Sequence, residues 1–297
     1  MKILLGCDVD PVLPPLLERP PTGDVWGCLA NVDELVRVAH DNLPPITWLI
    51  RSDESIRFCT GDFASGYRSK QTLWRLLEAR GHELGWHVHL WSFDERRGCF
   101  MFDPTPPWLA QAHAALAACF SVRATRTGWD YGSAALFETL DRLGVVLAFS
   151  ALPGYVVWHR VGREDVKVDW LRCPATPYHP ASDDYQRPGA LRLLEVPVTQ
   201  FTNSALGAVM RLGWRIRHRC WALAGLGNKT RMLTEPWDEA PVAQGPVMAF
   251  HFHPEDLTGG GLANLMQNVA TLRRLPGAEF VTASGAHAHL TAGQVRA

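Results

Sequence analysis

The sequence has no long hydrophobic run and no excess of charge of either sign. Its longest apolar stretches, such as Val145–Phe149 and Val247–Phe250, fall far short of the roughly 20 residues that a transmembrane helix needs. The 29 Lys and Arg residues against 30 Asp and Glu residues leave a net charge of −1. That balance argues against a protein that holds nucleic acid over its whole surface. We therefore expect neither a membrane-spanning helix nor a nucleic-acid partner.

Paired cysteines are also missing. The seven cysteines are an odd number, lie far apart and include no Cys-x-x-Cys motif. This pattern favours free thiols in a reducing compartment over a disulfide framework or a structural zinc site. The segment that starts at Met1 reaches Asp8 too early for a signal peptide. We therefore expect a cytoplasmic protein.

The chain has no low-complexity tract, no internal repeat and no Ser/Gly-rich or charge-rich linker. With 47% hydrophobic and 20% charged residues, it is neither disordered nor fibrous. A chain of this length buries about 75% of the surface that its unfolded form exposes, so one core can form without disulfides. We expect residues 1–297 to form a single domain.

Strand-like runs alternate with helix-like runs, which is typical of β-α units around a parallel sheet. The predicted strands are Lys2–Cys7, Ile46–Ile50, Glu83–Leu90, Val122–Arg126, Val145–Ser150, Leu193–Val198, Val247–Phe252 and Glu279–Ala283. The predicted helices are Val32–His40, Ser69–Arg80, Pro107–Phe120, Ser133–Leu143 and the stripe Leu262–Leu272. This order favours an α/β fold, a barrel of the (β/α) type.

Two stretches interrupt the alternation. Residues 153–192 are rich in Pro, Tyr, Asp and Arg and indicate a loop-rich insert with short hairpins near a site. Residues 203–232 are apolar and basic and indicate a basic helical segment. The segment has two interpretations: an additional helix pair with a solvated basic face, or a surface that meets an anionic substrate or the inner face of a membrane.

Three predicted strands end in a pair of polar side chains separated by one residue. The pairs are Asp8 and Asp10, His87 and His89, and His251 and His253. In a strand both members of such a pair lie on one side, and functional side chains of a parallel barrel sit at the carboxyl ends of its strands. Two neighbouring carboxylates are unfavourable unless a cation lies between them. Carboxylate and imidazole together suit zinc or a related divalent ion.

Each pair alone has an ordinary explanation. An Asp-x-Asp motif is usually a turn or the start of a helix, and a His-x-His motif usually contributes one buried and one exposed side chain. Three such pairs at three strand ends are not expected from chance. The sequence therefore predicts a metal-dependent site.

The order of these motifs resembles the polysaccharide deacetylase family, the chitooligosaccharide deacetylase homology domain. The similarity runs from about Leu4 to His253 and is most specific in Gly81–His89, which reads Gly-His-Glu-Leu-Gly-Trp-His-Val-His. It implies a distorted (β/α)7 barrel and a divalent metal, usually zinc. It also implies hydrolysis of an N-acyl or O-acyl group, most often acetyl from an amino sugar.

The resemblance also implies roles for individual residues. Asp8 matches the catalytic base and Arg126 the arginine that orients it. Asp10 and His87 match metal ligands. His253 matches the acid that protonates the leaving amine.

The chain departs from the family pattern at two positions. Residue 91, where the pattern has its second metal histidine, is Trp, so we take His89 as the third ligand. Residue 128, where the pattern has proline, is Gly. Trp91 and Trp129 lie beside these site residues, and we expect their rings to line the substrate cleft.

A carboxylate partner for His253 is harder to place. Asp169, in the dipeptide Asp169-Trp170, is a candidate, but the sequence does not assign it to this role.

These observations predict a hydrolase that uses a divalent metal, most often zinc, to remove an N-acyl group from an amino sugar or another sugar-containing metabolite. Its partner would be an acylated amino sugar or glycoconjugate. One alternative is a deformylase or deacylase of a phospho- or lipid-linked sugar, whose phosphate the basic segment would bind. Another is a catalytically silent sugar-binding barrel, because position 91 has lost its histidine. An amidohydrolase of the class that opens with His-x-His is least favoured, since this chain opens with Asp-x-Asp.

Overall fold

The computed structural model describes residues 1–11, 13, 25–161, 164–202, 228–229, 231–237, 241, 243 and 245–294. Most of the predicted basic segment, residues 203–227 and 230, lies outside them.

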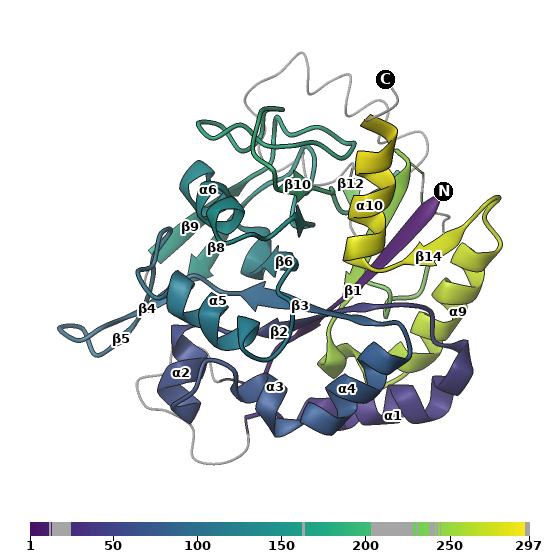
Figure 1. The fold of residues 1–297 in the computed structure, drawn as a ribbon, viewed down its shortest axis with the longest axis horizontal. Coiled ribbons are helices and arrows are strands. Elements are labelled where there is room, and N and C mark those ends of the chain that lie inside the picture. Colours follow the sequence, from purple (N-terminus) through teal and green to yellow (C-terminus); the bar gives the residue numbers. More distant parts are fainter. Residues whose placement is uncertain are drawn as a thin grey trace.

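Seven parallel strands curl into the central sheet in the order β10-β7-β6-β3-β2-β1-β13 (Figure 1). Beyond β10 the chain reaches β13, where Val198 forms a parallel bridge with Ala249, and this contact joins the two edges of the sheet. The strands are β1 (Lys2–Val9), β2 (Thr47–Arg51), β3 (Glu83–Val88), β6 (Ala124–Thr127), β7 (Leu147–Ala148), β10 (Leu194–Glu195) and β13 (Val247–Phe252). The predicted distorted (β/α)7 barrel is confirmed.

The eighth predicted strand forms, but it is not an additional wall of the barrel. β14 (Glu279–Val281) pairs with the first residues of β1, while β2 pairs with the last residues of the same strand. One edge of β1 therefore pairs first with β14 and then with β2.

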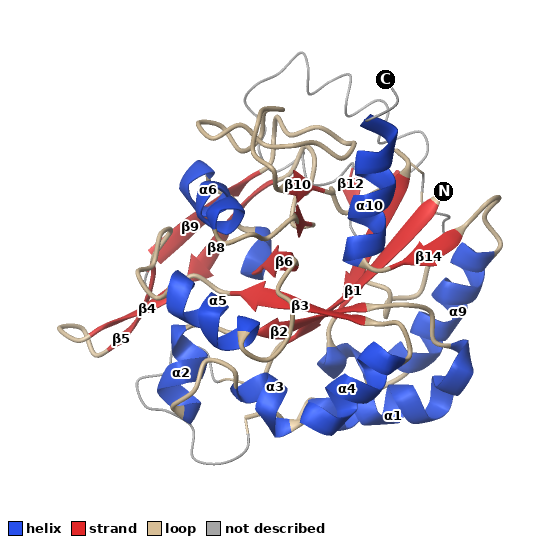
Figure 2. Cartoon of the chain, in the orientation of Figure 1, coloured by secondary structure: helices blue, strands red, loops and turns tan. Residues whose placement is uncertain are grey.

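Helices cover the outer face of the sheet (Figure 2). They are α1 (Leu29–Ala39), α2 (Glu54–Thr60), α3 (Ser65–Ser69), α4 (Gln71–Ala79), α5 (Leu109–Ala117), α6 (Ala134–Arg142), α9 (Gly261–Arg273) and α10 (Ala283–Gln294), with the 3₁₀ helices η1 (His40–Asn42), η2 (Gly128–Asp130) and η3 (Pro254–Leu257). Five helices match the predicted ones. The sequence analysis missed the short helices α2 and α3 as well as α10, whose Ala-, Gly- and His-rich sequence has no apolar stripe.

Short antiparallel pairs extend from the barrel. They are β4 (Trp91–Asp94) with β5 (Cys99–Phe102), β8 (Val156–Val161) with β9 (Glu164–Asp169), and β11 (Phe201–Thr202) with β12 (Asn228–Lys229). In Figures 1 and 2 the first two hairpins project to the same side of the molecule. The β8–β9 hairpin opens the stretch 153–192, and the rest of that stretch is largely irregular.

Side chains inside the barrel form an apolar layer beneath a polar one. The apolar layer consists of Leu4, Leu49, Ala124, Leu147, Phe149, Leu194, Val196, Val247 and Ala249. Two residues further along three of these strands, on the same side of the chain, lie Arg51, Arg126 and His251. The polar end of the barrel therefore rests on a packed apolar floor.

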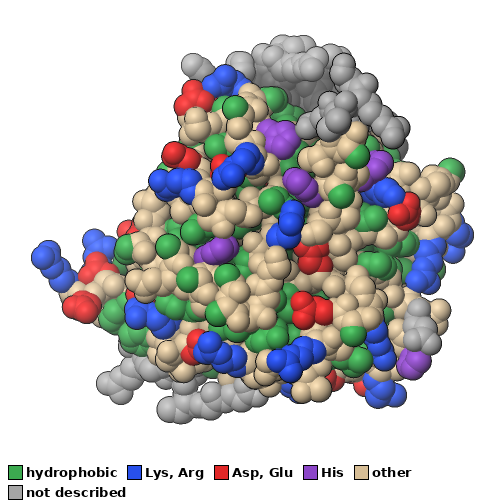
Figure 3. Space-filling model, in the orientation of Figure 1, with side chains coloured by type: hydrophobic (Ala, Val, Ile, Leu, Met, Phe, Trp, Pro, Cys, Tyr) green, Lys and Arg blue, Asp and Glu red, His purple; other side chains and the backbone are tan. Residues whose placement is uncertain are grey.

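Neither the charges on the face drawn in Figure 3 nor the helices of the described residues indicate a function. On the face drawn in Figure 3, basic and acidic side chains are interspersed, and neither sign gathers into a continuous patch. No helix among the described residues combines the length and the apolar character needed to cross a bilayer. The cysteines of the described ranges are all free thiols, three of them buried.

Gly6 makes room for the apolar floor. A Cβ atom at this position of β1 would lie 2.4 Å from Cε2 of Phe149, which reaches across from β7. Ordinary carbon contacts are about 3.5–4.0 Å, so any larger residue would displace the Phe149 ring.

We expect Gly6→Ala to lower the free energy of unfolding by about 1–3 kcal/mol, the usual cost of overpacking a core. Urea unfolding of the purified variant measures this. Gly27→Ala is the control, because a Cβ there meets no atom within 4 Å. If the two variants were equally stable, the proposed contact with Phe149 would be wrong.

Candidate active site

The polar end of the barrel collects side chains from four strands. Asp8 belongs to β1 and Asp10 follows it; His87 belongs to β3 and His89 follows it; Arg126 belongs to β6; and His253 directly follows β13. Because the strands are parallel, their carboxyl ends meet at one end of the barrel. The structure brings all six predicted catalytic and metal-binding residues together there.

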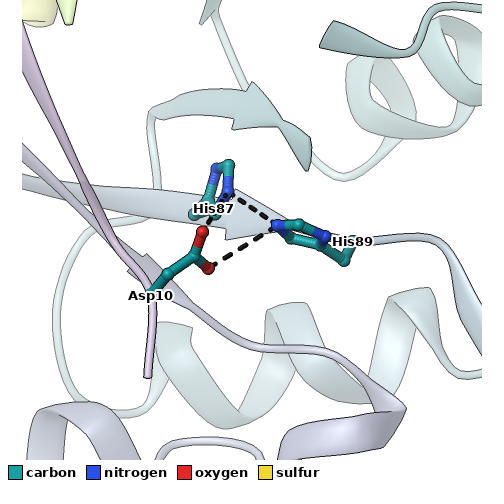
Figure 4. A group of neighbouring side chains, drawn as sticks. All are labelled: Asp10, His87 and His89. Carbon is teal, nitrogen blue, oxygen red and sulfur yellow. Dashed lines mark hydrogen bonds and ion pairs between the residues drawn. The ribbon is translucent and has the colours of Figure 1, made fainter. Parts of the chain in front are cut away.

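Three of these side chains point toward one another (Figure 4). The Nε2 atoms of His87 and His89 are 3.0 Å apart. Each also lies 3.5 Å from a carboxylate oxygen of Asp10. Two ligand atoms at about 2.1 Å from a tetrahedral zinc ion are about 3.4 Å apart. The donor types and their spacing therefore fit a divalent cation.

A hydrogen bond fixes the orientation of His87. Its Nδ1 lies 2.8 Å from the backbone carbonyl oxygen of Arg126. A carbonyl oxygen only accepts, so Nδ1 carries the hydrogen and the lone pair of Nε2 faces Asp10 and His89. Burial opposes a charged His87, but the carboxylates of Asp10 and Asp8 outweigh it and raise the pKa of this imidazole. The same negative field favours a metal cation.

Asp8 and Arg126 form a fully buried ion pair. One guanidinium nitrogen of Arg126 donates to Oδ2 of Asp8 and another donates to Asp130. Burial raises the pKa of Asp8, but Arg126 and then His87 outweigh it and lower this pKa to about 2. Asp8 is thus an ionised carboxylate at neutral pH.

Asp130 is a site residue that the sequence analysis missed. Trp129 and Asp130 have positive φ angles of 52° and 56°, a conformation that bulky side chains rarely adopt. Asp130 thereby reaches Arg126, four residues before it in the chain. Nothing in the residue pattern marks such a turn, so the sequence offered no signal beyond the presence of a carboxylate.

Arg51 was also missed. Its guanidinium lies 3.3 Å from Oδ1 of Asp10 and donates to Asp53 at 2.6 Å and to Ser55 at 3.0 Å. Asp53 in turn caps α2 by accepting from the amide of Ile56. The start of α2 thereby holds Arg51 against Asp10. The sequence did contain a signal for this residue, because an arginine stands at the end of a largely apolar, buried strand.

His253 lies between two carboxylates. Its Nε2 is 3.6 Å from Oδ2 of Asp8, and its Nδ1 is 3.1 Å from Oδ2 of Asp256. Burial opposes its charged form, but the hydrogen bond to Asp256 and the charge of Asp8 outweigh burial and raise the pKa of His253 to about 9. This imidazole is protonated at neutral pH.

The candidate assignment of Asp169 as the carboxylate partner of His253 was wrong. Its carboxylate binds Lys167 at 2.5 Å instead. The partner is Asp256, which also accepts from the backbone amide of His253. Asp256 lies three residues after His253, the N-cap of η3, and forms a capping box with it; this spacing was present in the sequence.

Aromatic rings border the three donor side chains of Asp10, His87 and His89. The ring of Trp129 lies edge-to-face on His89, with centroids 5.1 Å apart, and on Trp91, at 4.8 Å. His159 of β8 stacks on Trp129 at 6.3 Å. Both predicted substrate-binding tryptophans are partly exposed beside the site.

Known proteins resemble this chain in structure, although no similar sequence was found. No family model and no curated protein matches the sequence. A Mycobacterium smegmatis protein described as a polysaccharide deacetylase matches with a TM-score of 0.53, over 99% of this chain and 91% of its own, at 14% identity. A Pseudomonas aeruginosa PAO1 protein of the same description matches with a TM-score of 0.51, over 97% and 90%, at 10% identity. This chain has the fold of the polysaccharide deacetylases.

An allantoinase, Puue, is also similar to this chain in structure. It matches with a TM-score of 0.52, over 98% of this chain and 90% of its own, at 11% identity. Likenesses at this level of identity show the fold alone, so the substrate has to be argued from the site.

In this polysaccharide deacetylase fold, residue 91 is not a metal donor. Trp91 begins β4 and packs on Trp129, and an indole cannot ligate. His89 instead lies beside His87 and Asp10, two residues after His87 rather than four.

The ion pair of Asp8 makes stability depend on pH. Because the folded pKa of about 2 lies below the ordinary value of 3.8, the contribution of Asp8 is complete above about pH 4. It is lost as the pH falls through 2. In chelator-treated protein, we expect the difference in unfolding free energy between wild type and Asp8→Asn to be largest above pH 4 and to shrink toward pH 2.

Urea titrations at several pH values measure this difference. Asp33→Asn, which removes an exposed partner of Lys70, is the control and should give no such trend. A difference for Asp8→Asn that stays constant over this range would contradict the assignment.

Proposed function

We propose that this protein is a metal-dependent hydrolase that removes an N-acyl group, with acetyl the first candidate, from an amino sugar or another sugar-containing metabolite. One observation carries the proposal. An ionised carboxylate, Asp8, and a protonated imidazole, His253, lie 3.6 Å apart at the same end of the barrel as three donor atoms spaced for a divalent cation. A proton acceptor, a proton donor and a cation site are the groups that amide hydrolysis requires.

Asp10, His87 and His89 would hold the cation, for which zinc is our first choice because of the two imidazoles and one carboxylate. A bound divalent cation supplies Lewis acidity, which lowers the pKa of water and polarises an acyl oxygen. Three protein ligands would leave a further coordination position for water or substrate.

Asp8 is the base in this proposal. It accepts a proton from the water that attacks the acyl carbon. Arg126 keeps the carboxylate ionised and fixes its direction through the buried ion pair. Asp130 holds the other side of the guanidinium, so Arg126 cannot swing away from Asp8.

His253 is the acid. An amide nitrogen leaves poorly as an anion, so it must receive a proton as the C–N bond breaks. The imidazolium of His253 supplies that proton, and Asp256 stabilises its charged form before transfer. Water adds to the acyl carbon, and the products are a carboxylate and an amine.

The surroundings favour a ring-shaped substrate. Trp91 and Trp129 offer two partly exposed indoles next to the donors, and aromatic faces suit the apolar face of a sugar ring. His89 lies where a third donor is needed, and this supports an enzyme over a silent sugar-binding barrel. The alternative with a phospho- or lipid-linked substrate depends on the basic segment, most of which lies outside the described residues. Assays that compare a free N-acyl amino sugar with its phospho- or lipid-linked form separate the two. We assign the reaction to the cytoplasm on the cysteine pattern.

The proposal predicts a specific pair of variants. We expect purified wild type to bind one divalent ion and to release acetate or formate from at least one N-acyl amino sugar in a panel. His87→Ala should lose the ion, because a ligand is gone. Asp8→Asn should retain the ion and lose about 10²–10⁴-fold in turnover, the usual contribution of a general base.

Metal analysis and acid-release assays measure both quantities. His289→Ala, a change at an exposed histidine of α10, should keep both the ion and the activity. Wild-type turnover in Asp8→Asn, or a metal-free wild type, would contradict the proposal.

The role of His253 predicts the alkaline limb of activity. The acid must be protonated, so turnover should fall as the pH rises through about 9. Asp256→Asn removes the hydrogen bond to the charged imidazole, which is worth about 1.5–3 kcal/mol. Since one pKa unit is about 1.4 kcal/mol, the limb should move to lower pH by about one unit or more.

The profile of kcat/KM against pH tests this expectation. Glu255→Gln removes a charge from the same turn and leaves the His253–Asp256 hydrogen bond in place, so its shift should be much smaller. An unchanged limb in Asp256→Asn would assign the acid to another group.

A further inference from the structure

Gly128 lies directly against the ring of His89. A Cβ atom at residue 128 would lie 2.5 Å from Cγ, Cδ2 and Nε2 of that ring, whereas ordinary contacts are about 3.5–4.0 Å. The φ angle of Gly128 is not in the left-handed region, so other residues could adopt its backbone conformation. What the glycine provides is space.

The ring of His89 is held by packing. It lies edge-to-face on His87, with centroids 4.8 Å apart, and edge-to-face on Trp129. Its Nδ1 is buried and has no hydrogen-bond partner among the described residues, in contrast to Nδ1 of His87. On the side of the ring away from Nε2, the described residues hold His89 only by van der Waals contacts, including those of Gly128 and Trp129; Nε2 itself faces His87 and Asp10.

The atom that a side chain at residue 128 would displace is also the proposed metal donor. Nε2 of His89 is 3.0 Å from Nε2 of His87, and a Cβ at residue 128 would have to push it by about 1 Å to restore an ordinary contact. Metal–ligand distances tolerate only about 0.2 Å.

We propose that Gly128 is a positioning residue for the metal site: its lack of a side chain is what allows the His89 imidazole to face Asp10 and His87. This inference rests on the proposed metal-dependent function. Gly128 itself touches neither metal nor substrate, and it acts through His89 alone.

A double-mutant cycle tests whether Gly128 acts on metal binding through His89. Cobalt(II) or zinc(II) binding is titrated for wild type, Gly128→Ala, His89→Ala, the double variant and Gly27→Ala. We expect Gly128→Ala to weaken binding by about 10–100-fold, the range for residues that support metal ligands. The double variant should bind as weakly as His89→Ala, because the contact no longer exists. Gly27→Ala should match wild type.

Thermal unfolding of chelator-treated protein gives a reading that does not depend on metal. Gly128→Ala should lower Tm in the wild-type background and leave Tm unchanged when added to His89→Ala. If Gly128→Ala does not fold, a folded double variant still supports the contact with His89. Failure of both to fold would show that Gly128 acts through the backbone and would overturn the inference.

The outcomes separate this inference from the proposed function. Equal metal affinity in wild type and Gly128→Ala, or losses that multiply in the double variant, overturns the role of Gly128 and leaves the hydrolase intact. A wild type that binds no divalent ion overturns both.

Discussion

The candidate site depends on one buried residue, Arg126. Its guanidinium binds Asp8 on one side and Asp130 on the other, and its backbone carbonyl accepts the Nδ1 hydrogen of His87. This residue of β6 thus fixes both Asp8 of β1, the proposed general base, and His87 of β3, a proposed metal donor. Burying charges costs several kcal/mol for each ion, and a well-packed apolar group is often as stable. Stability alone does not account for such a residue, whereas the chemistry proposed for Asp8 and His87 does.

The surroundings separate two titratable groups that lie only 3.6 Å apart. Arg126 keeps Asp8 ionised, while Asp256 keeps His253 protonated. Groups whose environments drive their pKa values in opposite directions are the usual basis for assigning a base and an acid. Each member also favours the charged form of the other, so both groups are already charged before a substrate binds.

The sequence predicted those parts of the molecule that follow from periodicity. Alternation along a strand placed Asp8 with Asp10 and His87 with His89, and parallel strands brought their ends together. Periodicity cannot predict the site residues whose positions depend on turns and helix caps. Asp130 reaches Arg126 only because two consecutive residues have positive φ, and Arg51 is held by the cap of α2, a helix that was not predicted. Asp256 could have been found, since its position follows a capping pattern.

The two departures from the family pattern become a single local change once the structure is considered. With Trp at residue 91, the second imidazole comes from residue 89, closer along the chain to His87, and its ring occupies the space above residue 128. Proline at that position, as in the pattern, would carry a Cβ into the ring. Glycine removes this conflict. Trp129 then packs edge-to-face on the His89 imidazole, and Trp91 packs edge-to-face on Trp129. In the proposed ligand set, the position of the second imidazole and the glycine at residue 128 are therefore linked by one steric requirement.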